Sequence, residues 1–133
     1  MSKRKGPEAT IEREVCDIAE SHGFLAWKFT SPNLAGVPDR MIVAPWGLVS
    51  FWEFKAPGKA IEPDSPQERR CKELASRGVL VVMCDATTKG EALLYAMSDP
   101  ELYAAALAQI DVERQEALHA PQIITTPVSD SRH

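Results

Sequence analysis

The chain has 133 residues and is 44% hydrophobic, which is enough apolar content for one packed domain. No apolar run approaches the roughly 20 residues that a membrane helix needs, and no apolar signal segment follows the basic N-terminus. The three cysteines are widely spaced and form no CxxC pair, which argues against a disulfide framework and a zinc site; we expect buried thiols at Cys16, Cys71 and Cys84. These features predict a soluble, cytoplasmic protein.

The net charge is −4, but the charges are unevenly distributed along the chain. Residues 1–72 carry 11 Lys and Arg against 10 Asp and Glu, whereas residues 73–133 carry 4 against 9. If some carboxylates of the first half hold a cation, the rest of that half is positive. The distribution therefore permits nucleic-acid binding without indicating it.

The first half of the chain predicts a helix followed by three strands. Apolar residues at helical spacing, a proline near the start and a glycine after the end place the helix at about residues 7–22. A strand over residues 24–29 and a loop over residues 31–38 are expected next. Strands over 40–44 and 48–54 then form a hairpin.

The second half predicts one further strand among helices. Ser65-Pro66-Gln67-Glu68 combines a capping box with a proline at the first helical position, which predicts a helix to about Arg77. The continuous apolar run over residues 79–84 is typical of a central strand covered on both faces. A short helix, a long helix and a loose tail complete the chain over residues 90–97, 100–118 and 120–133. This order predicts a mixed sheet flanked by helices.

Three charged residues converge on the predicted hairpin. Glu53 and Lys55 end an apolar strand and point to the same face, because side chains alternate along a strand. If Ala44 pairs with Leu48 across the three-residue turn, Asp39 lies opposite Glu53. Two carboxylates this close favour a hard divalent cation between them, although a one-residue slip would separate them. Spacing alone leaves a buried Glu53–Lys55 salt bridge as the alternative.

Five segments in order resemble the virus-type replication-repair nuclease (VRR-NUC) family of the PD-(D/E)xK superfamily, whose stand-alone members are often phage proteins. The resemblance covers about residues 8–97. Its segments are Lys28-Phe29-Thr30-Ser31-Pro32, Gly36-Val37-Pro38-Asp39-Arg40, Glu53-Phe54-Lys55-Ala56-Pro57-Gly58, Gln67 at a helix start, and Gly78-Val79-Leu80-Val81-Val82. The resemblance implies a restriction-endonuclease-like α/β core with a C-terminal helical extension. We therefore expect one nuclease domain over residues 1–119, followed by the flexible tail that the composition of residues 120–133 predicts.

The resemblance also implies a set of site residues. Mg²⁺ or Mn²⁺ would be held by Asp39, Glu53, the carbonyl of Phe54 and the helix glutamate Glu12, for which Glu8 is the rival. Lys55 would be the catalytic lysine, and Gln67 would approach the water or the phosphate. Side chains that could contact the nucleic-acid backbone are Lys28, Ser31, Arg40, Lys59, Arg69 and Arg70, with Arg40 the strongest of them.

The implied reaction is hydrolysis of DNA by a water that a metal activates, without a covalent enzyme intermediate or a small-molecule cofactor. The family suggests structure-selective cutting of branched DNA such as Holliday junctions. Paired cuts would then require a homodimer, for which Trp46 and the helix after Pro100 are candidate surfaces. Two alternatives remain open: an endonuclease directed by duplex sequence or mismatches, and a catalytically silent DNA-binding module of the same fold. Trp52 and Phe54, opposite Glu53, are expected in the core or at a subunit interface.

Overall fold

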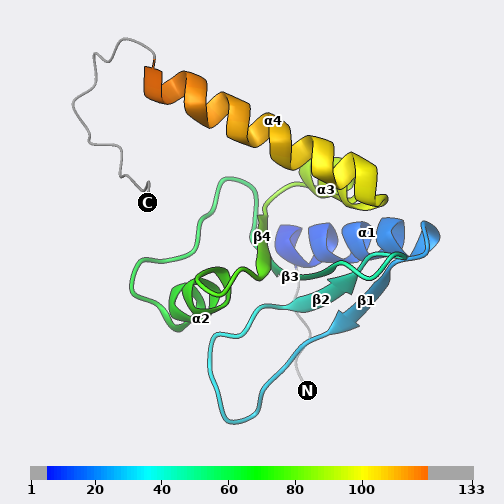
Figure 1. The fold of residues 1–133 in the computed structure, drawn as a ribbon. Helices are drawn as coiled ribbons and strands as arrows, with labels where there is room; N and C mark the ends of the chain where they lie inside the picture. The colour runs from blue at the N-terminus through cyan, green and yellow to red at the C-terminus, as the bar shows by residue number, and fades with distance from the viewer. Residues whose placement is uncertain (1–5, 120–133) are drawn as a thin grey trace.

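The structure is a computed structural model that describes residues 6–119. Its elements follow the predicted order of one helix, three strands, one helix, one strand and two helices (Figure 1). They are α1 (Pro7–Ser21), β1 (Leu25–Lys28), β2 (Arg40–Val43), β3 (Val49–Phe54), α2 (Pro66–Ala75), β4 (Leu80–Cys84), α3 (Thr87–Met97) and α4 (Pro100–His119). Over the described residues, no helix combines the length and apolar character needed to cross a membrane. The tail predicted over residues 120–133 lies outside the described part.

The four strands form one mixed sheet in the order β1-β2-β3-β4. β1, β2 and β3 form an antiparallel meander, and β4 runs parallel to β3. The β2–β3 register pairs Arg40 with Trp52 and Val43 with Val49, and the turn is closed by a 2.8 Å hydrogen bond from the Ala44 amide to the Leu48 carbonyl. The register predicted from the three-residue turn is therefore confirmed.

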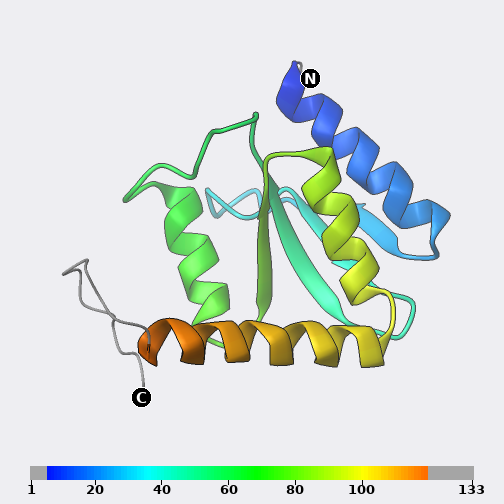
Figure 2. The ribbon, with the colours of Figure 1, turned by 90° about the horizontal axis from the view of Figure 1, so that it is seen from above.

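Helices cover both faces of the sheet, but unequally. Figure 2 shows α2 on one side, with α1 and α3 on the other and α4 running across one end. The fully buried core lies under α1 and α3 and includes Val15, Ile42, Trp52 and Phe54. α2 contributes no fully buried residue. The α2 face of the sheet is therefore the more open one, and the predicted core position of Trp52 and Phe54 is confirmed.

The start of α2 follows from its capping sequence. The Ser65 hydroxyl accepts a hydrogen bond from the Glu68 amide at 3.2 Å, and Pro66 occupies the first turn. The Glu68 carboxylate reaches back to the Asp64 amide at 2.8 Å. These contacts satisfy amides that have no partner within the helix, so the helix begins where its sequence predicts.

The prediction of a central strand over residues 79–84 was wrong. β4 pairs only with β3 and lies at the edge of the sheet. It is nevertheless covered on both faces, because α2 contacts it from one side and α3 from the other. This coverage explains the continuous apolar run. A strand that is covered on both faces has apolar side chains at successive positions, whether it lies at the centre or at the edge of the sheet. α3 also starts at Thr87, three residues before the predicted start.

Candidate active site

The hairpin brings Asp39 and Glu53 together. Arg40 pairs with Trp52, so the same register places Asp39 opposite Glu53, on the sheet face away from Trp52. The Phe54 amide donates a 2.8 Å hydrogen bond to Asp39 Oδ2, which holds this carboxylate against the end of β3. Glu53 is only 5% exposed. Two carboxylates of adjacent strands therefore share one face.

Lys55 lies two residues after Glu53 and points to the same face of the sheet as the two carboxylates. Its ammonium Nζ lies 3.8 Å from Glu53 Oε2, and its side chain is 19% exposed. The Lys55 amide donates to the Cys84 carbonyl at 2.9 Å, which ties the end of β3 to the end of β4. The ammonium is thus held beside Glu53 at the joined ends of β3 and β4.

Gly36 allows the loop before Asp39 to lie directly on the first turn of α2. Its φ is +89°, and a Cβ at this position would lie 2.3 Å from the Pro66 carbonyl carbon and 2.7 Å from the Gln67 amide nitrogen. Only glycine fits such an approach between backbones. This contact brings the start of α2, with the half-buried Gln67, next to the Pro38-Asp39 end of the loop.

Cys71 also lies at this site, one turn after Gln67 on α2. It is half-buried, so the expectation of a fully buried thiol holds for Cys16 and Cys84 but was wrong for Cys71. Burial raises the pKa of the Cys71 thiol, the negative charges of Glu53 and Asp39 raise this pKa further, and Lys55 lowers it. Only a buried thiol was expected at Cys71; its i, i+4 spacing from Gln67 is the sequence signal that could have placed it at this site.

These opposing influences on the Cys71 pKa predict how fast the thiol is alkylated. Asp39→Asn and Glu53→Gln each remove a negative charge, which lowers the pKa and increases the thiolate fraction at pH 8, so we expect severalfold faster modification by iodoacetamide. Lys55→Met removes a positive charge and should slow it. Peptide-resolved mass spectrometry measures the rate at Cys71, with buried Cys16 as the internal control. Equal rates in all variants would mean that Cys71 does not face the three charges.

Glu12 lies in an ion pair with Arg40. Glu12 is 4% exposed, and its Oε2 accepts from Arg40 Nε at 2.7 Å and from Lys28 Nζ at 3.5 Å. Arg40 also donates from Nη1 to the Ala26 carbonyl at 3.0 Å. Burial lowers the pKa of Arg40, but the hydrogen bond and charge of Glu12 more than offset this and raise it above its ordinary value. The contacts of Glu12 and Arg40 anchor α1 to β1 and β2.

This pairing separates Glu12 from the other expected ligands. Arg40 shares its face with Trp52, toward α1, whereas Asp39 and Glu53 share the opposite face. Over residues 6–119, His, Cys, Asp and Glu side chains form no group of three or more that could hold a metal ion. The structure thus brings Asp39, Glu53, Lys55 and Cys71 together. Glu12 as a ligand, and its half-buried rival Glu8, stay predictions.

The expected backbone-contacting residues are dispersed. Lys59 and Arg69 are exposed, Ser31 is half-buried, and the side chain of Lys28 is 61% exposed beside Glu12. The guanidinium of Arg40, the strongest of this set, is held by Glu12 and Ala26, so its contact with DNA stays a prediction.

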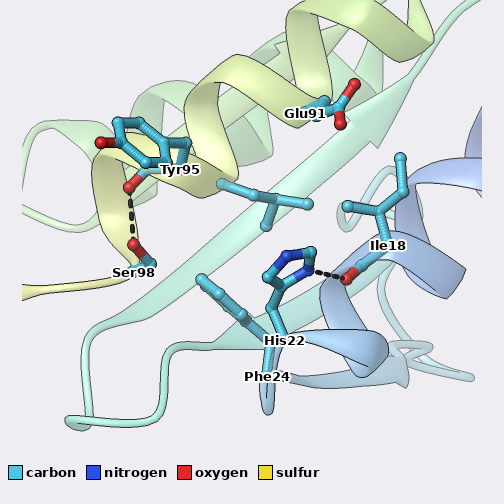
Figure 3. Close-up of a pocket in the computed structure, with 7 residues that line it drawn as sticks. Ile18, His22, Phe24, Glu91, Tyr95 and Ser98 are labelled. Atoms are coloured by element: carbon cyan, nitrogen blue, oxygen red, sulfur yellow. Dashed lines mark hydrogen bonds between the residues drawn. The ribbon is translucent and has the colours of Figure 1, made fainter.

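A small pocket of about 110 Å³ between α1 and α3 lies away from this site. Figure 3 shows His22 and Phe24 facing Tyr95 and Ser98 across it. Its polar groups are bonded locally: His22 Nδ1 lies 2.9 Å from the Ile18 carbonyl oxygen, and the Ser98 hydroxyl donates to the Tyr95 carbonyl at 2.7 Å. No residue of the Asp39–Glu53 group lines it, so we do not place chemistry there.

A mixed sheet with an aspartate entering one strand and a Glu-x-Lys ending its hairpin partner defines the PD-(D/E)xK class of nuclease folds. The chain is 37% identical over 79 residues to "Putative nuclease p44" of Acyrthosiphon pisum secondary endosymbiont phage 1, a match that covers 59% of this chain and 83% of that protein. A solved VRR_NUC domain superposes with a TM-score of 0.60 at 22% identity, covering 68% of this chain and 97% of that domain. No family model matches the sequence. The chain belongs to the same family as the phage protein "Putative nuclease p44", and its fold is that of the VRR_NUC domain.

Proposed function

We propose that this protein is a metal-dependent endonuclease that hydrolyses phosphodiester bonds of DNA at Asp39, Glu53 and Lys55. The observation that carries the proposal is the β2–β3 register, which sets two carboxylates opposite each other with an ammonium beside them. A group of this kind on an open sheet face is suited to phosphate chemistry. The relationship to the phage protein supports the same function, since that protein is named "Putative nuclease p44".

The donor set fits Mg²⁺ or Mn²⁺. Asp39 and Glu53 would hold the cation with the Phe54 carbonyl, and a third acid would be Glu12 if it left Arg40. Magnesium commonly binds proteins through one or two carboxylates and keeps several waters, so two acids are sufficient. When bound, the cation supplies charge neutralisation for the phosphate and activation of the attacking water.

The protein's own groups would orient the reactants around that charge. Lys55 Nζ would position the attacking water, or stabilise the negative charge that develops on the phosphoryl oxygens. Gln67, brought to the site by the contact between Gly36 and α2, would donate or accept a hydrogen bond at the water or the phosphate. Lys28, Ser31, Lys59 and Arg69 would contact the DNA backbone, where positive charge adds affinity without sequence preference.

A cleavage assay tests this function. Purified protein is incubated with Mg²⁺, Mn²⁺ or Ca²⁺ and with four labelled substrates: a four-way junction, a flap, a single strand and a linear duplex. We expect cutting with Mg²⁺ or Mn²⁺ and faster cutting of the branched substrates. Preference for one duplex sequence or for mismatches would favour the sequence-directed alternative. Binding without cutting under every condition would favour a silent DNA-binding module.

We further propose that two copies act together on branched DNA, since paired cuts across a junction need two sites in a fixed relation. α4 packs on α3 and leaves large apolar side chains exposed, among them Leu107 at 45% and Ile110 at 51%. Trp46 instead donates from its indole to the Met97 carbonyl at 2.9 Å and packs against Tyr103 within its own chain. α4 is therefore the stronger candidate for the interface.

Light scattering at micromolar protein should give the mass of a dimer. Introducing charge on the exposed apolar face with Leu107→Glu and Ile110→Glu should shift the protein to a monomer, because a buried carboxylate without a partner opposes association. Gln109→Glu, which adds one charge to the same helix at an exposed polar position, should leave the dimer intact. A monomeric wild-type mass would remove the dimer from the proposal and leave the nuclease itself unaffected.

A further inference from the structure

A second, larger pocket lies on the α2 face, between the loop that leads into Asp39 and the C-terminal half of α2. Its volume is about 360 Å³, and we call it the Phe29 pocket. Its apolar wall includes Phe29, Leu34, Pro38 and Leu74, and its polar wall includes Arg70 and Arg77. It exists because α2 has no fully buried residue and so leaves the space over this face open.

The aromatic wall is held in a defined orientation. The Phe29 ring packs against Phe51 of β3, with ring centroids 5.1 Å apart and planes inclined by 56°. The Phe29 amide also donates to the Asp39 carbonyl at 3.0 Å, which ties this wall to the candidate active site. A fixed aromatic ring beside an open apolar space is suited to stacking with a flat ligand.

The polar wall carries two guanidinium groups that Glu73 holds in place. Arg70 Nη2 lies 3.0 Å from Glu73 Oε2, and Arg77 Nη1 donates to the Glu73 carbonyl at 2.9 Å. Arg70 Nε is buried and has no hydrogen-bond partner among the residues that the structure describes. Because Arg70 Nε itself is out of reach, the donors open to a ligand in the pocket are the remaining guanidinium N–H groups of Arg70, whose side chain is 17% exposed, and of Arg77.

The pocket adjoins the charged group described above. Pro38 of its wall directly precedes Asp39, and Arg70 directly precedes Cys71, whose thiol senses the charges of Glu53 and Asp39. A ligand in the pocket would therefore lie beside a phosphate held at the hairpin. Two arginines against the one carboxylate of Glu73 leave this wall with a net positive charge, which matches the negative charge of a nucleic-acid backbone.

We propose that the Phe29 pocket receives one unpaired nucleobase of the DNA, next to the phosphodiester bond that is cut. The base would stack on Phe29 and accept a hydrogen bond from a guanidinium N–H of Arg70 or Arg77. A base inside a duplex is stacked and paired, so it could enter only after unpairing. The pocket would thus favour single-stranded or branched DNA over a continuous duplex. This inference rests on the proposed nuclease function and specifies how its substrate is recognised.

The experiment is a double-mutant cycle between the base and the aromatic ring. The cut site on a labelled branched oligonucleotide is mapped first, and each nucleotide beside it is then replaced in turn by an abasic residue. At one position we expect the abasic change to raise KM about tenfold with little change in kcat. Phe29→Leu, which keeps an apolar side chain of similar size, should raise KM for the intact substrate by a similar factor and make the abasic change neutral.

Two further variants keep the test sharp. Phe29→Tyr retains a stacking ring and should restore the wild-type KM. Tyr95→Ala removes an exposed aromatic ring at the α3 pocket and should leave KM and the abasic effect unchanged. If the abasic and Phe29→Leu effects multiply, or if no position is sensitive, the pocket does not hold a base.

The same cycle measured on Kd by fluorescence anisotropy, with Ca²⁺ in place of Mg²⁺, separates this inference from the nuclease itself. Coupling between the base and Phe29 in Ca²⁺, together with no cleavage of any substrate in Mg²⁺ or Mn²⁺, would overturn the proposed function and keep the pocket. Cleavage without coupling between the base and Phe29 would keep the proposed function and overturn the role of the pocket.

Discussion

Asp39→Asn and Glu53→Gln are each expected to abolish detectable cleavage while the protein stays folded. Both changes preserve side-chain shape but remove a negative charge from the face on which the two carboxylates meet. Without both charges, neither a divalent cation nor the phosphate it neutralises would be held for attack. Cleavage of a labelled junction with Mn²⁺ gives the activity, and calorimetric titration with Mn²⁺ should show the loss of binding in both variants.

Lys55→Met separates metal binding from catalysis. Its ammonium lies 3.8 Å from Glu53 Oε2 but supplies no ligand atom, so Mn²⁺ binding should persist. The rate of cleavage should fall by about 10²–10³-fold, the effect typical of removing one group that stabilises a developing charge. Full activity in any of the three variants would contradict the role assigned to that residue.

Glu12→Gln distinguishes the two roles open to Glu12. As the partner of Arg40, the carboxylate contributes a charge-assisted hydrogen bond, and its loss should lower the free energy of unfolding by about 1–3 kcal/mol. In that case Mn²⁺ affinity changes little. If Mn²⁺ binding is lost together with activity, Glu12 is a ligand, as the family resemblance implies.

Gly36→Ala is expected to destabilise the protein and to impair cleavage together. The new Cβ would lie 2.3 Å from the Pro66 carbonyl carbon, in a backbone that cannot move without displacing α2, and φ at this position is +89°. Overpacking of this kind together with a left-handed backbone should lower the free energy of unfolding by at least about 2 kcal/mol. Displacement of the loop would also shift Asp39 relative to Gln67.

Gly78→Ala is the matched control. Gly78 has a similar φ of +83°, but nothing lies within 4 Å of the position its Cβ would take. Gly78→Ala therefore introduces only the strain of a left-handed backbone. We expect it to lower the free energy of unfolding by about 1 kcal/mol and to leave cleavage unchanged. Urea denaturation followed by fluorescence gives the free energies of unfolding, and the cleavage assay gives the activities. Equal effects at the two glycines would show that the contact between the loop and α2 does not position the site.

The sequence by itself determined the features that depend on neighbours along the chain. Alternation in β3 placed Glu53 and Lys55 on one face, and the three-residue turn set the register that brings Asp39 opposite Glu53. The start of α2 followed from Ser65 and Glu68, whose side chains reach only adjacent amides. Such local rules act over two to five residues, so periodicity and turn chemistry were enough to predict them.

The tertiary structure decided what depends on packing between distant segments. The pairing of Glu12 with Arg40 joins residues of α1 and β2, and the approach of Gly36 to Pro66 joins a loop to a later helix. The edge position of β4 and the half-buried state of Cys71 depend likewise on where α2 and α3 come to rest. No periodic pattern encodes these contacts, because each depends on the three-dimensional fit of whole elements, and a side chain's local sequence is compatible with several such fits.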